Sequence, residues 1–305
     1  MKNYFVIGIM SGTSIDGIDL VYVNFFYDRS WTFKILSSIT YEYDKEWQNI
    51  LKNISDKNID SIKLIDDSYT KLLSEYILKF INDFSIKNID FISSHGHTAL
   101  HDPSNSLTYQ IGNLKELSNY TGLKVICDFR VQDIKLGGQG APLVPVGEKY
   151  IFPEYDTLIN LGGFANITIK SNNNLIAYDI CPVNIVFNHL TNLINLKYDD
   201  KGKISSSGNI NLELFNHLES LDYYKQVSPK SLGVEWVKEI ILPIINSFSE
   251  IPVENLLNTF SKHFASQIAN NINSSDKTLI TGGGAYNDYL IQNIMDLTES
   301  KIVIP

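Results

Sequence analysis

The chain has 305 residues, and at about 150 residues per domain this length predicts two domains. A hydrophobic content of 44% with 19% charged residues supports packed cores and excludes a disordered chain. The 25 Lys and Arg against 34 Asp and Glu give a net charge of −9, which disfavours nucleic acid or an anionic membrane surface as a partner.

The chain also lacks the usual marks of membrane or secreted proteins. No apolar run approaches the roughly 18–20 residues that a membrane-spanning helix needs, and the amino terminus MKNYFVIGIMSG lacks the pattern of a signal peptide. Two cysteines cannot form a disulfide framework or a four-cysteine zinc site. We therefore expect a cytoplasmic protein.

The first half begins with a predicted hairpin. Residues 4–10 (YFVIGIM) and 20–26 (LVYVNFF) are apolar runs rich in β-forming residues, and the sequence between them has turn chemistry. Helical spacing over 45–84 follows, and then a predicted strand over 89–93 runs into SHGHTALHDPS. A short helix over 115–120 and a strand over 124–127 are predicted next.

The second half repeats the hairpin half a chain length later, with the strands TLINL and FANITI around Gly162-Gly163. On this pattern alone, a duplicated domain and two unrelated hairpins are both open. Helices are predicted near 183–194, 233–248, 253–272 and 287–297, and a strand over 278–280. The alternation of strands and helices predicts an α/β fold. The final KIVIP is a strand candidate, which can be a natural terminal strand or mark a truncated chain.

The sequence GIMSGTSIDGID, residues 8–19, places glycines and hydroxyls in a tight turn after a strand, as a phosphate cradle requires. Gly12 and Gly17 have the glycine spacing of a P-loop, but the Lys-Ser/Thr pair is missing, so the motif is not a Walker A sequence. It is not a G-x-S-x-G nucleophile elbow either. Asp16 or Asp19 could hold Mg²⁺ through water. An ordinary hairpin turn is the alternative.

Three histidines, His95, His97 and His101, follow the strand over 89–93. Their spacing is not that of H-E-x-x-H, and no Cys or Glu follows nearby, which disfavours a zinc site. A polar loop at the carboxyl end of a strand, presenting Thr98 and imidazoles to a ligand, is the favoured interpretation.

Arg29 and Arg130 are the only arginines of the chain. Arg130 lies in CDFRVQDIKLGGQGAPLVP, after a short strand and before a Gly-rich loop. The planar guanidinium suits a ligand carboxylate or phosphate at this position. A structural salt bridge to Asp128 or Asp133 is the alternative.

Two further motifs lie in the second half. Asp179, in YDICPVN, is a carboxylate at a strand end before a Pro and a helix, where a general base could project into a cleft; a cap or turn role is the alternative. The glycines of TGGG, between a strand and a helix, permit close approach of a base or a phosphate.

The order of these motifs is that of the actin, Hsp70 and sugar-kinase superfamily: two Gly-tipped hairpins for phosphates, then strand–GGG–helix for adenosine. More narrowly, the chain resembles the anhydro-N-acetylmuramic acid kinase family from residue 8 to about residue 287. The resemblance rests on GIMSGTSIDGID, SHGHT, DFRVQD, GGQGAPLVP, LGGFANIT and YD-x-x-P-x-N, followed by the weaker KSLGVEW and GGGAYN.

The resemblance implies an α/β fold of two ribonuclease-H-like domains that flank an interdomain cleft. Residues 1–128 would form the first domain, with the phosphate-1 hairpin and the sugar loop. Residues 129–305 would form the second, with the phosphate-2 hairpin, the catalytic Asp and the adenosine motif. Family members continue into a D-x-x-E-A-x-x-F-A-type helix, so we expect the C-terminal family segment to be missing. The resemblance also implies a homodimer.

The implied activity uses ATP and Mg²⁺ to open the 1,6-anhydro ring of anhydro-N-acetylmuramic acid with water and to phosphorylate O6, in cell-wall recycling. Asp179 would activate the water, Thr98 and Arg130 would contact the sugar, and Asp16 would serve the metal. The residues implied to hold ATP are Gly12, Thr13, Ser14, Ile15, Asp16, Gly17, Ile18, Asp19, Gly162, Gly163, Gly282, Gly283 and Gly284.

The chain departs from the family pattern at three positions. Cys181 and Val183 replace glycines of D-T/C-G-P-G-N, so bulky side chains are expected to crowd the water or the sugar. His97 replaces the amide of HGQT. The alternative functions are a kinase-like protein that binds nucleotide or sugar without turnover, and a kinase for a different sugar.

Overall fold

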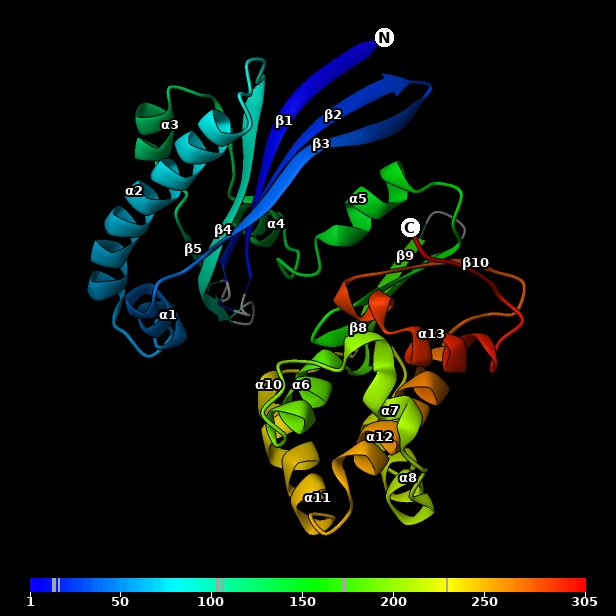
Figure 1. Ribbon diagram of the computed structural model, residues 1–305. Coiled ribbons are helices and arrows are strands. Elements are labelled where there is room, and N and C mark those ends of the chain that lie inside the picture. Colours follow the sequence, from blue (N-terminus) through cyan, green and yellow to red (C-terminus); the bar gives the residue numbers. More distant parts are fainter. Residues whose placement is uncertain (13–14, 16, 103–104, 106, 172–173, 229) are drawn as a thin grey trace. The chain divides into compact units, whose positions relative to one another are not determined.

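The computed structural model describes residues 1–12, 15, 17–102, 105, 107–171, 174–228 and 230–305 (Figure 1). The chain divides into two compact units, Met1–Ile151 and Phe152–Pro305. Both units are α/β, as predicted, and each has one mixed sheet with its own hydrophobic core. No helix in the described ranges combines the length and the apolar character that crossing a membrane requires.

The sheet of the first unit has the order β3-β2-β1-β4-β5, with β6 also paired to β4. β1, β2 and β3 form an antiparallel meander, while β4 is parallel to β1 and to β6. The strands are β1 (Lys2–Ser11), β2 (Gly17–Asp28), β3 (Ser30–Glu42), β4 (Phe91–Asp102), β5 (Leu107–Ile111) and β6 (Val125–Ile126).

Helix α2 (Ile59–Asp83) lies along one face of this sheet (Figure 1). Its apolar positions include Ile62, Leu73 and Ile77, which share one core with alternate residues of β1 and β2. The helix begins where the side chain of Asn58 accepts a hydrogen bond from the N–H of Ser61. The other helices of this unit are α1 (Lys45–Lys52), α3 (Glu116–Thr121), α4 (Phe129–Lys135) and α5 (Val144–Ile151).

The sheet of the second unit has the order β11-β10-β7-β8-β9. Its strands are β7 (Thr157–Leu161), β8 (Phe164–Ser171), β9 (Asn174–Pro182), β10 (Lys277–Thr281) and β11 (Lys301–Val303). The helices are α6 (Asn184–Asn192), α7 (Lys203–Ser207), α8 (Leu212–Glu219), α9 (Asp222–Lys225), α10 (Val234–Trp236), α11 (Leu242–Ser247), α12 (Val253–Ala269) and α13 (Asp288–Met295), with short turns at η2 (Asp200–Gly202), η3 (Val237–Ile241) and η4 (Gly283–Tyr286).

The two sheets share one topology. In each unit three antiparallel strands are followed by a strand parallel to the first, which gives β3-β2-β1-β4-β6 and β9-β8-β7-β10-β11. This third–second–first–fourth–fifth order is the ribonuclease-H-like arrangement, and it confirms the predicted fold class and the duplication. The predicted domain boundary between residues 128 and 129 falls inside the first unit, where Arg130 of α4 bonds to His95 of β4.

One predicted loop is a strand. The sequence SHGHTALHD, expected as a polar loop, continues β4 as far as Asp102 because it pairs with β5, a strand that the sequence pattern did not predict. The pairing of β4 with its neighbours therefore sets the direction of its histidine side chains.

Candidate active site

β1 ends at Ser11 and β2 begins at Gly17. Thr13, Ser14 and Asp16 of the predicted phosphate motif lie outside the described residues. Ile15 has a φ of 58°, and its N–H donates to the carbonyl of Gly12 at 3.4 Å. A side chain at Gly17 would meet the carbonyl oxygen of Tyr41 at 2.5 Å, so glycine is required there for β2 to pair closely with β3.

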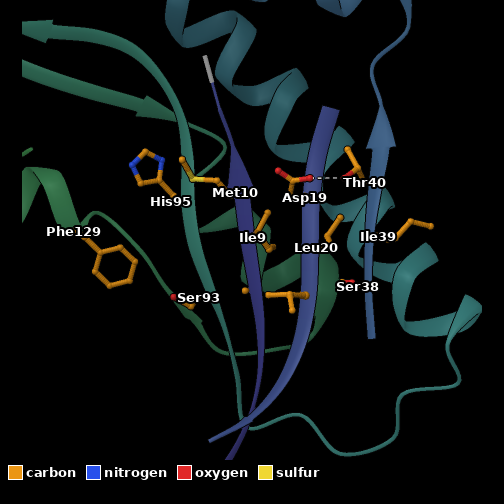
Figure 2. A pocket seen from close by; sticks show the side chains of 12 residues that line it. Ile9, Met10, Asp19, Leu20, Ser38, Ile39, Thr40, Ser93, His95 and Phe129 are labelled. Carbon is orange, nitrogen blue, oxygen red and sulfur yellow. Dashed lines mark hydrogen bonds between the residues drawn. The ribbon is translucent and has the colours of Figure 1, made fainter. Parts of the chain in front are cut away.

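The side chains of Ile18 and Asp19 lie on opposite faces of β2. Ile18 is fully buried in the core beside α2, which leaves only its main chain available to a ligand. Asp19 lies on the other face, where the hydroxyl of Thr40 donates to its Oδ1 at 2.5 Å (Figure 2).

Asp19 lines a cavity of about 520 Å³ on the face of the first sheet away from α2. Ser38, Thr40, Ser93 and His95 add polar groups to its wall, and Phe129 adds a ring (Figure 2). A cavity of this size, apolar in part and with a few convergent polar groups, suits a small ligand.

His97 is a buried group of the core rather than one of the ligand-facing imidazoles that the sequence pattern predicts. It is 2% exposed, and its Nδ1 lies 3.1 Å from Oγ of Ser11. The hydroxyls of Tyr43 and Tyr69 contact the same Oγ at 2.7 and 2.9 Å. Burial lowers the pKa of His97 to about 4, so the imidazole is neutral at physiological pH. This network holds the last residue of β1, just before the turn.

A β-bulge near His95 and Gly96 changes the register between β1 and β4. Thr98 alternates with the buried His97 and Ala99, and therefore lies on the opposite face of β4 from them. His95 lines the cavity, on the face away from α2. Because of the bulge, His95 faces the candidate site and His97 faces the core, although both lie on β4.

Arg130 is bound to this face of the sheet through His95. Its Nε–H donates to Nε2 of His95 at 2.9 Å, and Nη1 donates to the carbonyl of Gly140 at 3.2 Å. Nδ1 of His95 lies 2.9 Å from the carbonyl of Gly96. Since that carbonyl can only accept, the proton of the neutral ring is on Nδ1 and the lone pair on Nε2 faces Arg130. Burial and the charge of Arg130 hold the pKa of His95 below its usual value.

The alternative of a salt bridge to Arg130 is wrong for both candidate carboxylates. Oδ1 of Asp128 accepts a hydrogen bond from the amide of Asn113 at 3.3 Å, and Oδ2 of Asp133 accepts the N–H of Gly140 at 2.7 Å. Throughout the described ranges, no carboxylate forms an ion pair with Arg130. The same ranges contain no cluster of three or more His, Cys, Asp or Glu that could hold a metal ion.

In the second unit, Asp179 lies near the end of β9, beside a β-bulge. Ala165 of β8 pairs with Cys181 and Asn166 pairs with Asp179, so Ile180 is the extra residue. The amide of Asn166 donates to Oδ1 of Asp179. Oδ2 accepts from the N–H of Leu232 at 2.8 Å and from the hydroxyl of Ser231 at 3.1 Å. The carboxylate is partly exposed and oriented by three donors.

The main chain of Asp179 is held as firmly as its side chain. Its N–H donates to the carbonyl of Lys230 at 3.3 Å, and its carbonyl accepts the hydroxyl of Tyr223 at 2.5 Å. Sequence reasoning missed Asn166, Tyr223 and Ser231 as partners. Asn166 and Ser231 do occur in the strings LGGFANIT and KSLGVEW, whereas nothing in the sequence marks Tyr223.

The expected crowding by Cys181 and Val183 is wrong. Both side chains are fully buried in the core of the second unit. Burial raises the pKa of the Cys181 thiol well above its usual value. The two bulky residues therefore pack in the core and expose no surface to a ligand.

The two glycine motifs of the second unit meet at the end of β7. A side chain at Gly282, whose φ is +85°, would come within 2.8 Å of the carbonyl oxygen of Leu161, the residue before Gly162. At Gly163 and Gly283 a side chain would meet nothing within 4 Å. Open space beside a main chain is what a phosphate or a nucleotide base requires, and the nucleotide role of these glycines stays a prediction.

Comparison with known proteins gives one consistent answer. The profile of the anhydro-N-acetylmuramic acid kinase family matches residues 4–304. The anhydro-N-acetylmuramic acid kinase of Clostridioides difficile (strain 630) is 36% identical, over 95% of this chain and 83% of its own length. That of Sulfurimonas denitrificans is 32% identical, over 96% and 84%.

Among solved structures, component A of the Acidaminococcus fermentans (R)-2-hydroxyglutaryl-CoA dehydratase aligns with a TM-score of 0.49 at 14% identity, over 99% of this chain and 92% of its own. The profile match over nearly the whole chain and the identity to these relatives establish the family. The chain belongs to the anhydro-N-acetylmuramic acid kinase family.

Proposed function

We propose that the chain is an ATP-dependent kinase that opens the 1,6-anhydro ring of anhydro-N-acetylmuramic acid with water and phosphorylates O6, giving N-acetylmuramic acid 6-phosphate for cell-wall recycling. The observation that carries this proposal is the carboxylate of Asp179, which is partly exposed and held by three donors. Such a group can accept a proton from water without first losing side-chain freedom.

Asp179 acts as the general base through Oδ1. Oδ2 already accepts two hydrogen bonds, from Ser231 and Leu232, whereas Oδ1 accepts one, from Asn166. A lone pair on Oδ1 is therefore free for the proton of the attacking water. The water oxygen bonds to the anomeric carbon, the bond from that carbon to O6 breaks, and O6 leaves with the electron pair.

The oxygen released from the ring then bonds to the γ-phosphorus, and the bond from that phosphorus to ADP breaks. When bound, ATP would supply the phosphoryl group and Mg²⁺ would neutralise its charge. The main-chain groups proposed to hold the nucleotide are those of residues 12–19, 162–163 and 282–284. Asp16 is proposed to serve Mg²⁺.

Arg130 and Thr98 bind the sugar. The guanidinium has no carboxylate partner in the described part of the chain, so its charge is available for the lactyl carboxylate of the substrate. The protein is proposed to be cytoplasmic, where ATP is present, and to be a homodimer, which sedimentation can test.

A coupled assay of ADP release with ATP, Mg²⁺ and anhydro-N-acetylmuramic acid tests the proposal. We expect sugar-dependent ADP and a product heavier than the substrate by phosphate plus water. Binding of ATP without turnover would instead support a non-catalytic binding protein. Turnover with another anhydro sugar alone would identify a kinase of different specificity.

A further inference from the structure

Among the described residues, the guanidinium of Arg130 is held by neutral acceptors only. A guanidinium has five N–H donors. In the described part of the chain one donates to the imidazole of His95 and one to the carbonyl of Gly140. Arg130 is partly buried, and burial lowers the pKa of its guanidinium. Partial burial of a cation without an anionic partner costs free energy, which the negative charge of a ligand would offset.

His95 determines which edge of the guanidinium remains available. Because Nδ1–H donates to Gly96, the Nε2 lone pair accepts the Nε–H of Arg130. The N–H groups that stay without a partner in the described chain are on the two Nη atoms. These two nitrogens share one edge of the planar fork, and that edge matches both oxygens of a carboxylate.

The second acceptor of the guanidinium, the carbonyl of Gly140, lies in the Gly-rich loop. Gly140 has a φ of +72°, and its N–H donates to Asp133 at 2.7 Å, so its carbonyl is directed at Nη1 of Arg130. The carboxylate of Asp133 is thereby used on the main chain instead of neutralising the guanidinium. Within the described residues, these contacts orient the guanidinium and supply no carboxylate to neutralise it.

The cavity adjoins His95, one of the residues that hold Arg130. His95 lines the cavity wall and accepts the Nε–H of Arg130, and Phe129, the residue before Arg130, lines the same wall (Figure 2). A ligand in the cavity would therefore contact a residue that orients the guanidinium.

We propose that His95 is a positioning residue that gives the enzyme its preference for a carboxylate-bearing anhydro sugar, by holding the Nε–H of Arg130 so that the Nη edge faces the ligand. This inference rests on the proposed function. It predicts that loss of His95 weakens the recognition of the carboxylate and leaves the chemistry at Asp179 unchanged.

The test compares anhydro-N-acetylmuramic acid with 1,6-anhydro-N-acetylglucosamine, which lacks the lactyl group. For His95→Leu we expect KM for the carboxylate sugar to rise about 10- to 100-fold, since hydrogen bonds to charged groups have that strength. The KM for ATP should stay near the parent value, and the loss in kcat/KM should be at least about 10-fold smaller for the sugar without the carboxylate. His95→Gln is the matched variant, because its amide oxygen can accept the same N–H, and it should keep most of the preference.

Arg130→Lys provides a second test if His95→Leu does not fold, since lysine keeps the charge but lacks the Nε–H and the fork. Its kcat/KM should fall more for the carboxylate sugar than for the sugar that lacks the carboxylate. Equal losses for both sugars in these variants, or a His95→Gln protein as impaired as His95→Leu at an equal melting temperature, would overturn the inference.

Calorimetric binding of both sugars separates this inference from the proposed function. A parent protein that prefers the carboxylate sugar in binding but never releases ADP would refute the kinase proposal and keep the role of His95. A parent protein that turns over both sugars with equal kcat/KM would keep the kinase and refute the role of His95.

Discussion

The two charged groups singled out by the sequence, Arg130 in the first unit and Asp179 in the second, are held in complementary ways. Neutral acceptors, an imidazole and a carbonyl, surround Arg130. Neutral donors, an amide, a hydroxyl and a main-chain N–H, surround Asp179. Neither forms an ion pair in the described part of the chain.

The difference shows how one fold can prepare a cation to bind and an anion to react. A paired charge would be neutralised, whereas a charge held by dipoles is oriented and still acts on a ligand. In both units a β-bulge in the sheet accompanies the site: one near His95 in β4, and one at Ile180 in β9. Each bulge changes which face of its strand the following side chains occupy.

The largest effect is expected when the negative charge of Asp179 is removed. Asp179→Asn keeps the shape and should lower kcat by about 10²- to 10⁴-fold, the usual contribution of a general base. Binding of ATP, measured by calorimetry, should remain. Turnover at the parent rate would contradict the assignment of the base.

A smaller effect is expected when one donor is removed and the charge is kept. Ser231→Ala leaves Oδ2 of Asp179 with the N–H of Leu232 alone, and we expect kcat to fall by about 10-fold, the loss of one hydrogen bond to a charged group. The control is Ser231→Thr, which retains a hydroxyl. An unchanged kcat for Ser231→Ala would show that the orientation of the carboxylate does not depend on this bond.

A measurement of stability tests the buried hydrogen-bond network around Ser11. Tyr69 is fully buried and donates to Ser11, the last residue before the turn. Tyr69→Phe removes one donor to the hydroxyl of Ser11. The free energy of unfolding should therefore fall by about 1–3 kcal/mol. Tyr120→Phe, an exposed position on α3, should change it by less than about 0.5 kcal/mol. Equal stabilities in urea unfolding would contradict the role of the network.

The pH dependence gives the smallest effect and concerns the first site alone. The pKa of His95 lies below its usual 6.5, so the neutral ring binds Arg130 at pH 7 and the interaction is lost as the pH falls through the lowered pKa. Arg130 and His97 lie near the ring, Asp19 lines the same cavity, and Asp128 bonds to Asn113 nearby. KM for the sugar should rise by less than about 10-fold as the pH falls below 6.5, and this rise should be absent in His95→Gln.

Several features were available from the residues alone. The apolar runs around the Gly-rich turns predicted the two hairpins, and the halfway spacing suggested duplication, which the common strand order confirms. The edge strand β3 and the short β5 were missed. β3 carries many polar and exposed residues, and β5 is a strand only because β4 pairs with it.

By itself the sequence determined the chemical groups at hand: a lone arginine before a Gly-rich loop, an aspartate before a proline, and glycines where a ligand can approach a main chain. Only the tertiary structure decided their partners. Ser231 reaches Asp179 across 52 positions of the chain, and Arg130 reaches His95 across 35. It also decided that His97 belongs to the core while His95 faces the cavity. The physical reason is that periodicity reports the average face of a strand, whereas a bulge and the pairing of distant segments set the direction of each side chain.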